Sequence, residues 1–141
     1  YIFLFQIPRL PEYLLGKDLK GFFKKTFKNM SPHKTEVSDE VAGQYAKAYS
    51  QPGALTGALN YYRAMLRYRK ALPKYHPKLK IPILMLWGEQ DTALGKELTL
   101  NTHAYCENLE LIYDPTSGHF IQHDNPELVN RELVKFIATQ R

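Results

Sequence analysis

The chain has 141 residues, 44% of them hydrophobic and 13% aromatic, which suits one ordinary domain with a core and excludes a disordered or low-complexity segment. A single cysteine, Cys106, excludes an internal disulfide and a cysteine-based zinc site, and it is compatible with the cytoplasmic location that we favour. No apolar run approaches the roughly 18 residues that a membrane helix needs.

The net charge of +5 is distributed unevenly along the chain. Residues 1–80 carry fifteen lysines and arginines against five acidic residues, and residues 81–141 carry four against nine. A basic half can indicate a nucleic-acid or membrane partner. The lysines, however, are spread over several expected helices without a recognisable binding motif. We therefore interpret them as solvated faces and expect no nucleic-acid partner.

The first half of the chain is predicted to be helical. Residues 21–29 form a short basic and aromatic helix candidate. Ser38 is expected to cap a second helix that runs to about Tyr49, and its first turn holds Asp39 and Glu40, the charges that a helix N-terminus favours.

The strongest helical pattern covers residues 54–72. Its apolar side chains are spaced by four, three and four positions, which places them on one stripe. The members of this stripe are Leu55, Leu59, Tyr62 and Leu66. Pro73 is predicted to end the helix, because the residue before a proline disfavours the α conformation.

The pattern of apolar and polar residues changes near Lys80. Residues 81–87 form an almost continuous apolar run, typical of a strand that is buried on both faces in a parallel sheet. Residues 95–107 are predicted to be a helix and residues 109–113 a second strand.

A last helix is expected to begin with Asn125 as its N-cap and Pro126 at its first position. Four of its apolar side chains are expected to pack on the sheet: Val129, Leu133, Phe136 and Ile137. The order strand, helix, strand, helix predicts an α/β fold with a right-handed crossover. The expected division is a helical portion over residues 1–79 and a βαβα unit of a parallel sheet over residues 80–141.

Ligands of open parallel sheets meet the loops at the carboxyl ends of the strands. The two loops expected there, residues 88–91 and 115–119, contain Asp91 and His119. A carboxylate that accepts a hydrogen bond from imidazole fixes its tautomer and stabilises the imidazolium, so that the ring can act as a base. Each residue alone also fits a structural role, Asp91 as a turn former and His119 as a loop histidine. Together they indicate an acid-base pair.

Two segments resemble the acid strand and the histidine loop of α/β hydrolases: Ile-Leu-Met-Leu-Trp-Gly-Glu-Gln-Asp at residues 83–91 and Ser-Gly-His-Phe-Ile-Gln-His-Asp-Asn-Pro at residues 117–126. A narrower likeness lies upstream. The stretch Ser-Gln-Pro-Gly-Ala-Leu-Thr-Gly-Ala-Leu-Asn-Tyr-Tyr-Arg at residues 50–63 resembles the lid of epoxide hydrolases, and residues 1–8 resemble the entry into that lid.

This resemblance implies a partial α/β-hydrolase fold and a reaction of epoxides with water that needs no cofactor and no metal. In the family, an upstream aspartate attacks an epoxide carbon, two lid tyrosines donate to the ring oxygen, and a histidine activates water to cleave the resulting ester. By position, Tyr1 and Tyr62 match the tyrosines, Asp91 the orienting acid and His119 the base. A tyrosine stays protonated at neutral pH and can stabilise the developing alkoxide.

Structural readings of these residues stay open. Tyr62 lies on the apolar stripe of its helix and also fits a core tyrosine, Tyr61 lies beside it, and Tyr1 also fits a frayed end. His119 and His123 have a spacing that two metal ligands could use, but the segment lacks the glutamate of a zincin motif, so we reject a metal site. The other histidines are expected at the surface: His33, His76 and His103.

The sequence contains no Gly-x-Ser-x-Gly elbow, and no strand-turn-helix elbow precedes Asp91. The chain also begins with Tyr1 in what reads as the middle of an element. We therefore expect a piece that needs the rest of a hydrolase domain upstream and is inactive alone. A dehalogenase, a serine esterase and a non-catalytic truncated relative are the alternatives, and the missing nucleophile would separate them.

Overall fold

The computed structural model describes residues 1–34, 36–71 and 77–140. The chain divides into two compact units. The first consists of Tyr1–Thr26 and Val37–Lys74, and the second of Phe27–Glu36 and Tyr75–Arg141. Residues 27–36, which include the last turn of the helix Leu19–Met30, are thus grouped with the sheet.

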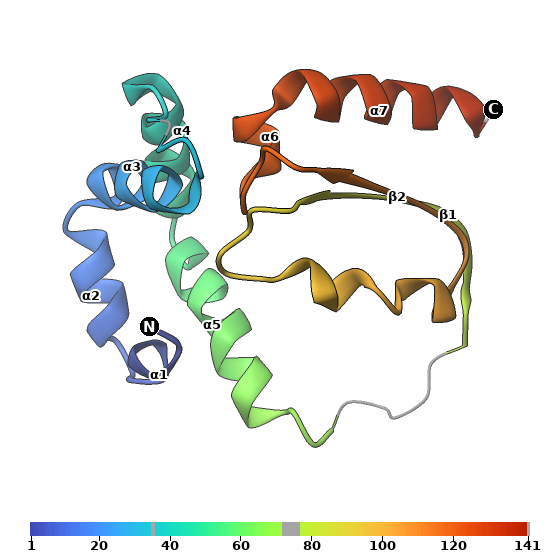
Figure 1. The fold of residues 1–141 in the computed structure, drawn as a ribbon. Coiled ribbons are helices and arrows are strands. Elements are labelled where there is room, and N and C mark those ends of the chain that lie inside the picture. Colours follow the sequence, from blue (N-terminus) through green and yellow to red (C-terminus); the bar gives the residue numbers. More distant parts are fainter. Residues whose placement is uncertain (35, 72–76, 141) are drawn as a thin grey trace. The chain divides into compact units, whose positions relative to one another are not determined.

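The described residues before 72 fold into helices (Figure 1). Their bounds are α1 Ile2–Phe5, α2 Leu10–Gly16, α3 Leu19–Met30, α4 Asp39–Tyr49 and α5 Ala54–Arg67. Helices α1, α2 and α4 all contact α5, which is the longest of this group. The first unit is therefore organised around α5.

The predicted stripe of α5 is its packed face. Leu59 is only 3% exposed, and the other three members of the stripe are partly covered. Tyr61, one position off the stripe, is 75% exposed. The helix ends at Arg67, about one turn earlier than predicted, because the chain enters a tight turn in which the amide of Ala71 donates to the carbonyl of Tyr68 at 2.8 Å. Pro73 lies outside the described residues.

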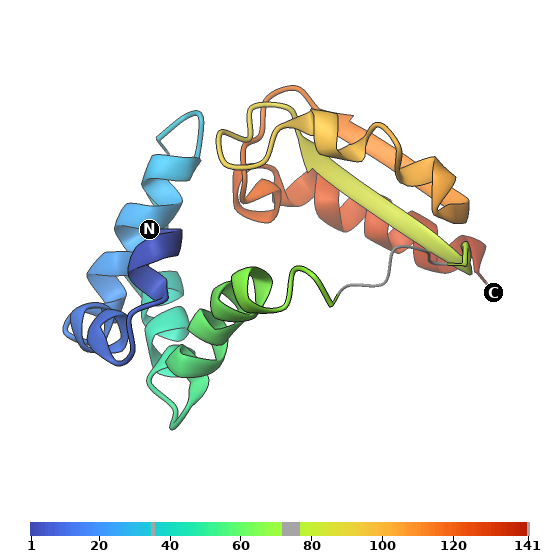
Figure 2. The same cartoon turned by 90° about the horizontal axis from the view of Figure 1, so that it is seen from below.

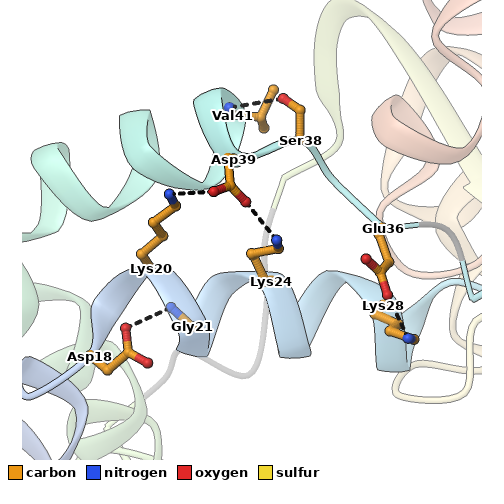
Figure 3. Close-up of polar contacts among 9 residues, drawn as sticks. All are labelled: Asp18, Lys20, Gly21, Lys24, Lys28, Glu36, Ser38, Asp39 and Val41. Atoms are coloured by element: carbon orange, nitrogen blue, oxygen red, sulfur yellow. Dashed lines mark hydrogen bonds and ion pairs between the residues drawn. The ribbon is translucent and has the colours of Figure 1, made fainter.

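Helix α4 begins with a side-chain cap, and ion pairs join it to α3 (Figure 3). The Ser38 hydroxyl accepts from the amide of Val41 at 3.2 Å, which confirms its predicted role as N-cap. Asp39, in the first turn of α4, accepts from Lys20 at 2.7 Å and from Lys24 at 2.6 Å. These two lysines lower the pKa of Asp39 to about 2. All three side chains are well exposed, so solvent screening keeps their contribution to stability small.

The second unit contains the predicted pair of parallel strands. Strand β1 (Leu79–Gly88) pairs with β2 (Cys106–Asp114), and the register runs from Ile83 opposite Leu109 to Gly88 opposite Asp114. The parallel arrangement and the α/β class are as the sequence predicted.

The connection between the strands differs from its prediction. The helix expected over residues 95–107 is wrong: two 3₁₀ turns, η1 (Lys96–Thr99) and η2 (Thr102–Ala104), stand in its place, and β2 begins at Cys106. Within η1 the Thr99 hydroxyl donates to the carbonyl of Lys96 at 2.7 Å. A parallel crossover nevertheless results.

Helix α7 (Pro126–Thr139) and the two 3₁₀ turns lie on opposite faces of the strand pair, as both views show (Figures 1 and 2). The side chain of Asn125 accepts from the amide of Leu128 at 3.1 Å, which confirms the predicted N-cap. Of the four apolar side chains expected to pack on the sheet, Val129 and Phe136 are partly covered, but Leu133 and Ile137 are 45% and 50% exposed.

Strand β1 was expected to be buried on both faces, and within the described residues it is not. Its first half is exposed, with Leu79 at 52% and Ile81 at 66%, and most of its second half is partly covered. The reason is that β1 has β2 on one edge, while the neighbouring elements cover only part of its faces. Among the described helices, none is both long and apolar enough to cross a membrane.

Candidate active site

The acid and the histidine predicted from the sequence lie together. Because β1 and β2 are parallel and end in register at Gly88 and Asp114, the loops that follow them leave from the same edge of the sheet. Oδ2 of Asp91 lies 2.8 Å from Nδ1 of His119. The predicted hydrogen-bonding contact between these two side chains is thus confirmed.

Asp91 is held on both of its carboxylate oxygens. Its Oδ1 accepts from the amides of Ala93 and Leu94 at 2.8 and 2.9 Å, which leaves Oδ2 for the histidine. The Asp91 side chain is 7% exposed and that of His119 is 28% exposed. A carboxylate facing Nδ1 keeps the ring proton there and leaves the Nε2 lone pair able to take a proton. The pair can therefore act as an oriented base.

The two loops fit together through backbone contacts that leave no room for a side chain at two glycines. A Cβ atom at Gly88 would lie 2.3 Å from the carbonyl oxygen of Gly118. A Cβ at Gly118 would lie 2.5 Å from the carbonyl oxygen of Met30. The amide of Gly118 also donates to Asp124 at 2.8 Å. The residue before His119 is therefore fixed from three sides.

Asp114, a residue that the sequence did not single out, organises the start of the histidine loop. It is 5% exposed and accepts from the Thr116 amide at 3.1 Å, the Thr116 hydroxyl at 2.8 Å, the Ser117 hydroxyl and the Asn125 side chain at 3.0 Å. Burial by itself would raise the pKa of Asp114, but these donors outweigh it and lower the pKa to about 2. Asp114 thus ties the end of β2 to the His119 loop and to the N-cap of α7.

Replacing Asp114 with asparagine is expected to lower the free energy of unfolding by about 2 kcal/mol at pH 7, since a buried amide cannot accept from all these donors. A depressed pKa in the folded state gives stability that is present above the unfolded pKa near 4 and is lost as the pH falls towards 2. The difference between the native protein and Asp114→Asn in urea unfolding should therefore shrink between pH 4 and pH 2. The exposed carboxylate variant Glu107→Gln is the control, and a constant difference over that range would contradict the assignment.

His123 has a different environment from His119. Its ring lies 4.7 Å from the ring of Phe27, centroid to centroid, and Phe27 also packs edge-on against Phe120 at 4.6 Å. Burial lowers the pKa of His123, with Asp124 acting in the opposite direction. His123 therefore fits an uncharged packing residue. His33 and His103 are exposed, as predicted, and His76 lies outside the described residues.

No cluster of three or more histidine, cysteine, aspartate or glutamate side chains that could hold a metal ion occurs among the described residues. Cys106 is a free, buried thiol. An open hollow of about 420 Å³ lies beside Asp91, between the turn after α3 and the loop after β1, and Lys34 and Gln90 are among its lining residues. His119 does not line it, so we assign it no part in the chemistry.

The two tyrosines singled out from the sequence also lie together. The rings of Tyr1 and Tyr62 are 5.8 Å apart between centroids and nearly perpendicular. Tyr62 is half-buried, and its burial, followed by the neighbouring Tyr1, Tyr49 and Tyr61, raises its pKa. Tyr1 is 69% exposed. These tyrosines belong to the first unit, whereas the acid and the histidine belong to the second.

No family model matches the chain. Curated relatives match it over nearly all of its length. The AB hydrolase superfamily protein YfhM of Bacillus subtilis (strain 168) is 33% identical over 141 residues, which are 99% of this chain and 48% of the relative. Epoxide hydrolase 3 of Mus musculus is 38% identical, and the match covers 97% of this chain and 37% of the relative. Epoxide hydrolase 4 of Homo sapiens is 32% identical, and the match covers 99% of this chain and 39% of the relative. The chain spans less than half the length of these relatives.

Solved structures agree with the relatives. Epoxide hydrolase VrEH1 from Vigna radiata superimposes with a TM-score of 0.76 at 26% identity and covers 99% of this chain and 51% of its own. Epoxide hydrolase A from Mycobacterium thermoresistibile gives a TM-score of 0.78 at 21% identity, and the match covers 98% of this chain and 51% of that protein. These likenesses confirm the fold class expected from the sequence.

Proposed function

Because this chain belongs to the α/β-hydrolase family, with epoxide hydrolases among its relatives, we propose that it forms part of an enzyme that opens epoxides to vicinal diols with water. The observation that carries the proposal is the contact between Tyr1 and Tyr62, since a pair of phenols supplies what a strained ring oxygen needs when it leaves as an alkoxide. The Asp91 and His119 pair supplies the second half of the reaction.

The proposed reaction has two steps. In the first, a carboxylate outside these 141 residues attacks an epoxide carbon, and the carbon–oxygen bond of the ring breaks towards the oxygen. The hydroxyls of Tyr1 and Tyr62 hydrogen-bond this oxygen as its charge develops. One of the two phenols transfers its proton to the oxygen, so that the alcohol forms and a phenolate remains. Splitting a hard displacement into ester formation and ester cleavage lowers the barrier of each part.

In the second step, Nε2 of His119 takes a proton from water while the resulting hydroxide attacks the ester carbonyl. Asp91 holds the ring through Nδ1 and stabilises the imidazolium that forms. When the tetrahedral intermediate collapses, its bond to the diol oxygen breaks and its hydroxyl proton passes to that oxygen, so that the carboxylate and the diol are released. The proton on the imidazolium returns through solvent to the phenolate formed in the first step. No cofactor and no metal take part in this scheme, and the other reactants are a small epoxide and water.

In the same proposal the two portions of the chain have different roles. Residues 1–79 serve as the lid that carries the tyrosines, and residues 80–141 serve as the C-terminal part of the core that carries the acid and the base. The rest of the core, including the nucleophile, comes from an upstream part of the hydrolase domain. Strand β1 supports this, because among the described residues it pairs with β2 alone and the apolar side chains of its first half, such as Leu79 and Ile81, are exposed.

The acid and histidine alone do not separate this function from an esterase with a serine nucleophile or from a dehalogenase, because all three cleave a covalent ester. The tyrosine pair favours the epoxide, because the alkoxide that leaves from an epoxide needs strong hydrogen-bond donors. A carboxylic ester needs its donors at the carbonyl oxygen, and a halide leaves without a donor as strong as a phenol. The identity of the nucleophile distinguishes aspartate chemistry from serine chemistry.

The proposal predicts that the 141 residues expressed alone do not convert a reactive aryl epoxide to its diol above the rate in buffer, because His119 then has no ester to cleave. The same residues within the full-length protein should convert it. Diol formation is measured by chromatography, with His119→Ala in both forms as the control. Turnover by the isolated chain that His119→Ala abolishes would show that the two-step scheme is wrong.

A further inference from the structure

Arg63, the residue after Tyr62 on α5, uses every N–H of its guanidinium group. Nε donates to the carbonyl of Phe5 at 2.8 Å. One terminal nitrogen donates to Glu12 at 2.7 Å and to Asn60 at 3.0 Å, and the other donates to Glu12 at 3.0 Å and to the carbonyl of Ile7 at 3.1 Å. An arginine has five such donors, and all five are satisfied here.

This arrangement is largely shielded from water. The Arg63 side chain is 13% exposed and that of Glu12 is 19% exposed. Glu12, by its hydrogen bond and then its charge, raises the pKa of Arg63, and Arg63 in turn lowers the pKa of Glu12. A bidentate pair of a guanidinium and a carboxylate has a defined geometry, which a lysine cannot reproduce. Arg63 therefore joins α2 to α5 at a fixed distance.

The two carbonyls that Arg63 binds lie at the end of α1 and just after it. Helix α1 has only four residues, and a helix this short does not hold its conformation by its own hydrogen bonds. Gln6 adds a second link, because its side chain donates to the carbonyl of Ile2 at 3.1 Å and to that of Tyr62 at 3.3 Å. The position of α1 on α5 thus depends on side chains, chiefly on Arg63.

We call the contacts of Arg63 with Glu12, Phe5 and Ile7 the clamp. The N-cap of α1 is Tyr1, so the clamp also determines where this tyrosine lies. The rings of Tyr1, Phe5 and Tyr62 contact one another edge-on, with centroid distances of 5.5 Å for Tyr1 and Phe5, 5.2 Å for Phe5 and Tyr62, and 5.8 Å for the two tyrosines. A shift of α1 relative to α5 would separate the two phenols even if both residues were unchanged.

We propose that Arg63, together with Glu12, is a positioning residue for ring opening: it holds α1 on α5 so that the hydroxyls of Tyr1 and Tyr62 meet the same epoxide oxygen. This inference rests on the proposed function and adds to it the residue on which the tyrosine pair depends. Arg63 itself touches no substrate in this scheme. A purely stabilising ion pair is the competing explanation, and the two differ in which step of the reaction they affect.

The test uses the full-length protein with Arg63→Lys, which keeps the charge and loses the fork, and with Arg67→Lys, an exposed arginine one turn further along α5, as the control. Ester formation from an aryl epoxide is followed in single-turnover experiments, and ester cleavage is followed separately. We expect Arg63→Lys to slow ester formation on the order of 100-fold, as small misplacements of reacting groups do. Ester cleavage, and both rates in Arg67→Lys, should stay unchanged.

A double-mutant cycle separates positioning from general stabilisation. In a Tyr1→Phe background Arg63→Lys should have little further effect on ester formation, because the hydroxyl that it positions is already absent. The inference would be overturned if the effects of Arg63→Lys and Tyr1→Phe on the rate of ester formation multiplied. It would also be overturned if Arg63→Lys slowed ester cleavage as much as ester formation. If Arg63→Lys fails to fold, Glu12→Gln, which keeps an acceptor and removes the charge, gives the same comparison with a smaller expected effect.

A second readout does not depend on catalysis. The ring carbon resonance of Tyr62, assigned by its disappearance in Tyr62→Phe, reports the titration of this phenol. Release of α1 should expose Tyr62 and bring its raised pKa back towards the ordinary value in Arg63→Lys but not in Arg67→Lys. If the native protein forms no ester with any epoxide, the proposed function fails, and this titration still decides whether Arg63 places α1: an unchanged pKa would rule the clamp out.

Discussion

Replacing His119 with alanine is expected to reduce diol formation roughly 100- to 10,000-fold, the range typical for loss of a general base. The loss should fall on ester cleavage alone, because the first step uses a carboxylate and two phenols and needs no base. The covalent ester should therefore accumulate, and the intact protein should gain the mass of one epoxide molecule. Mass spectrometry after mixing with a limiting aryl epoxide measures this gain.

His103→Ala serves as the matched control, because His103 is exposed and lies on the 3₁₀ turns between the strands. It should turn over normally without accumulating ester. Asp91→Asn should resemble His119→Ala in kind, since an amide facing Nδ1 no longer fixes the tautomer that leaves Nε2 free. A His119→Ala protein that forms diol at the native rate would remove His119 from the mechanism. One that forms no ester would place it in the first step.

Replacing Tyr62 with phenylalanine is expected to slow ester formation roughly 100- to 1,000-fold, the usual cost of removing one donor to a developing oxyanion. The ring and its edge contacts with Tyr1 and Phe5 remain, so the free energy of unfolding should change little. Burial raises the pKa of Tyr62, which keeps the hydroxyl protonated to higher pH than that of an ordinary tyrosine. The contribution of the Tyr62 hydroxyl to ring opening should therefore persist to higher pH than that of an ordinary tyrosine.

Tyr61→Phe is the control for this variant, since Tyr61 is the neighbouring tyrosine and is 75% exposed. Its ester formation should match that of the native protein. Single-turnover alkylation, followed by quenched-flow mass spectrometry, measures the rate in each case. An unchanged rate in Tyr62→Phe would return Tyr62 to the role of a packing residue on the covered stripe of α5.

The starts of α4 and α7 were predicted correctly because their signals are local. Ser38 and Asn125 cap helices through hydrogen bonds to amides three residues further along the chain. Such bonds depend on the residue type and its immediate neighbours alone. The helix predicted over residues 95–107 is wrong: Cys106 begins β2 opposite Leu79, a distant partner that the local sequence does not mark, and two 3₁₀ turns precede it.

The candidate acid-base pair could also be found from the sequence. Asp91 and His119 are 28 positions apart, yet each follows an apolar run that reads as a strand, and parallel strands deliver their following loops to one edge of the sheet. The parallel topology thus allows two local strand patterns to predict that Asp91 and His119 lie together. The same reasoning could not find Asp114, because an aspartate at the end of a strand also fits an ordinary turn former.

The sequence by itself therefore determined the class of fold, the parallel strands, the capped helices and the contact between Asp91 and His119. The tertiary structure alone decided how the tyrosines are held. Arg63 binds Phe5 and Glu12 across separations of 58 and 51 residues, and no pattern in the sequence marks these partners. A side chain with five donors can satisfy them on any nearby carbonyl or carboxylate. Which of these it meets is settled only when α1 and α2 pack on α5.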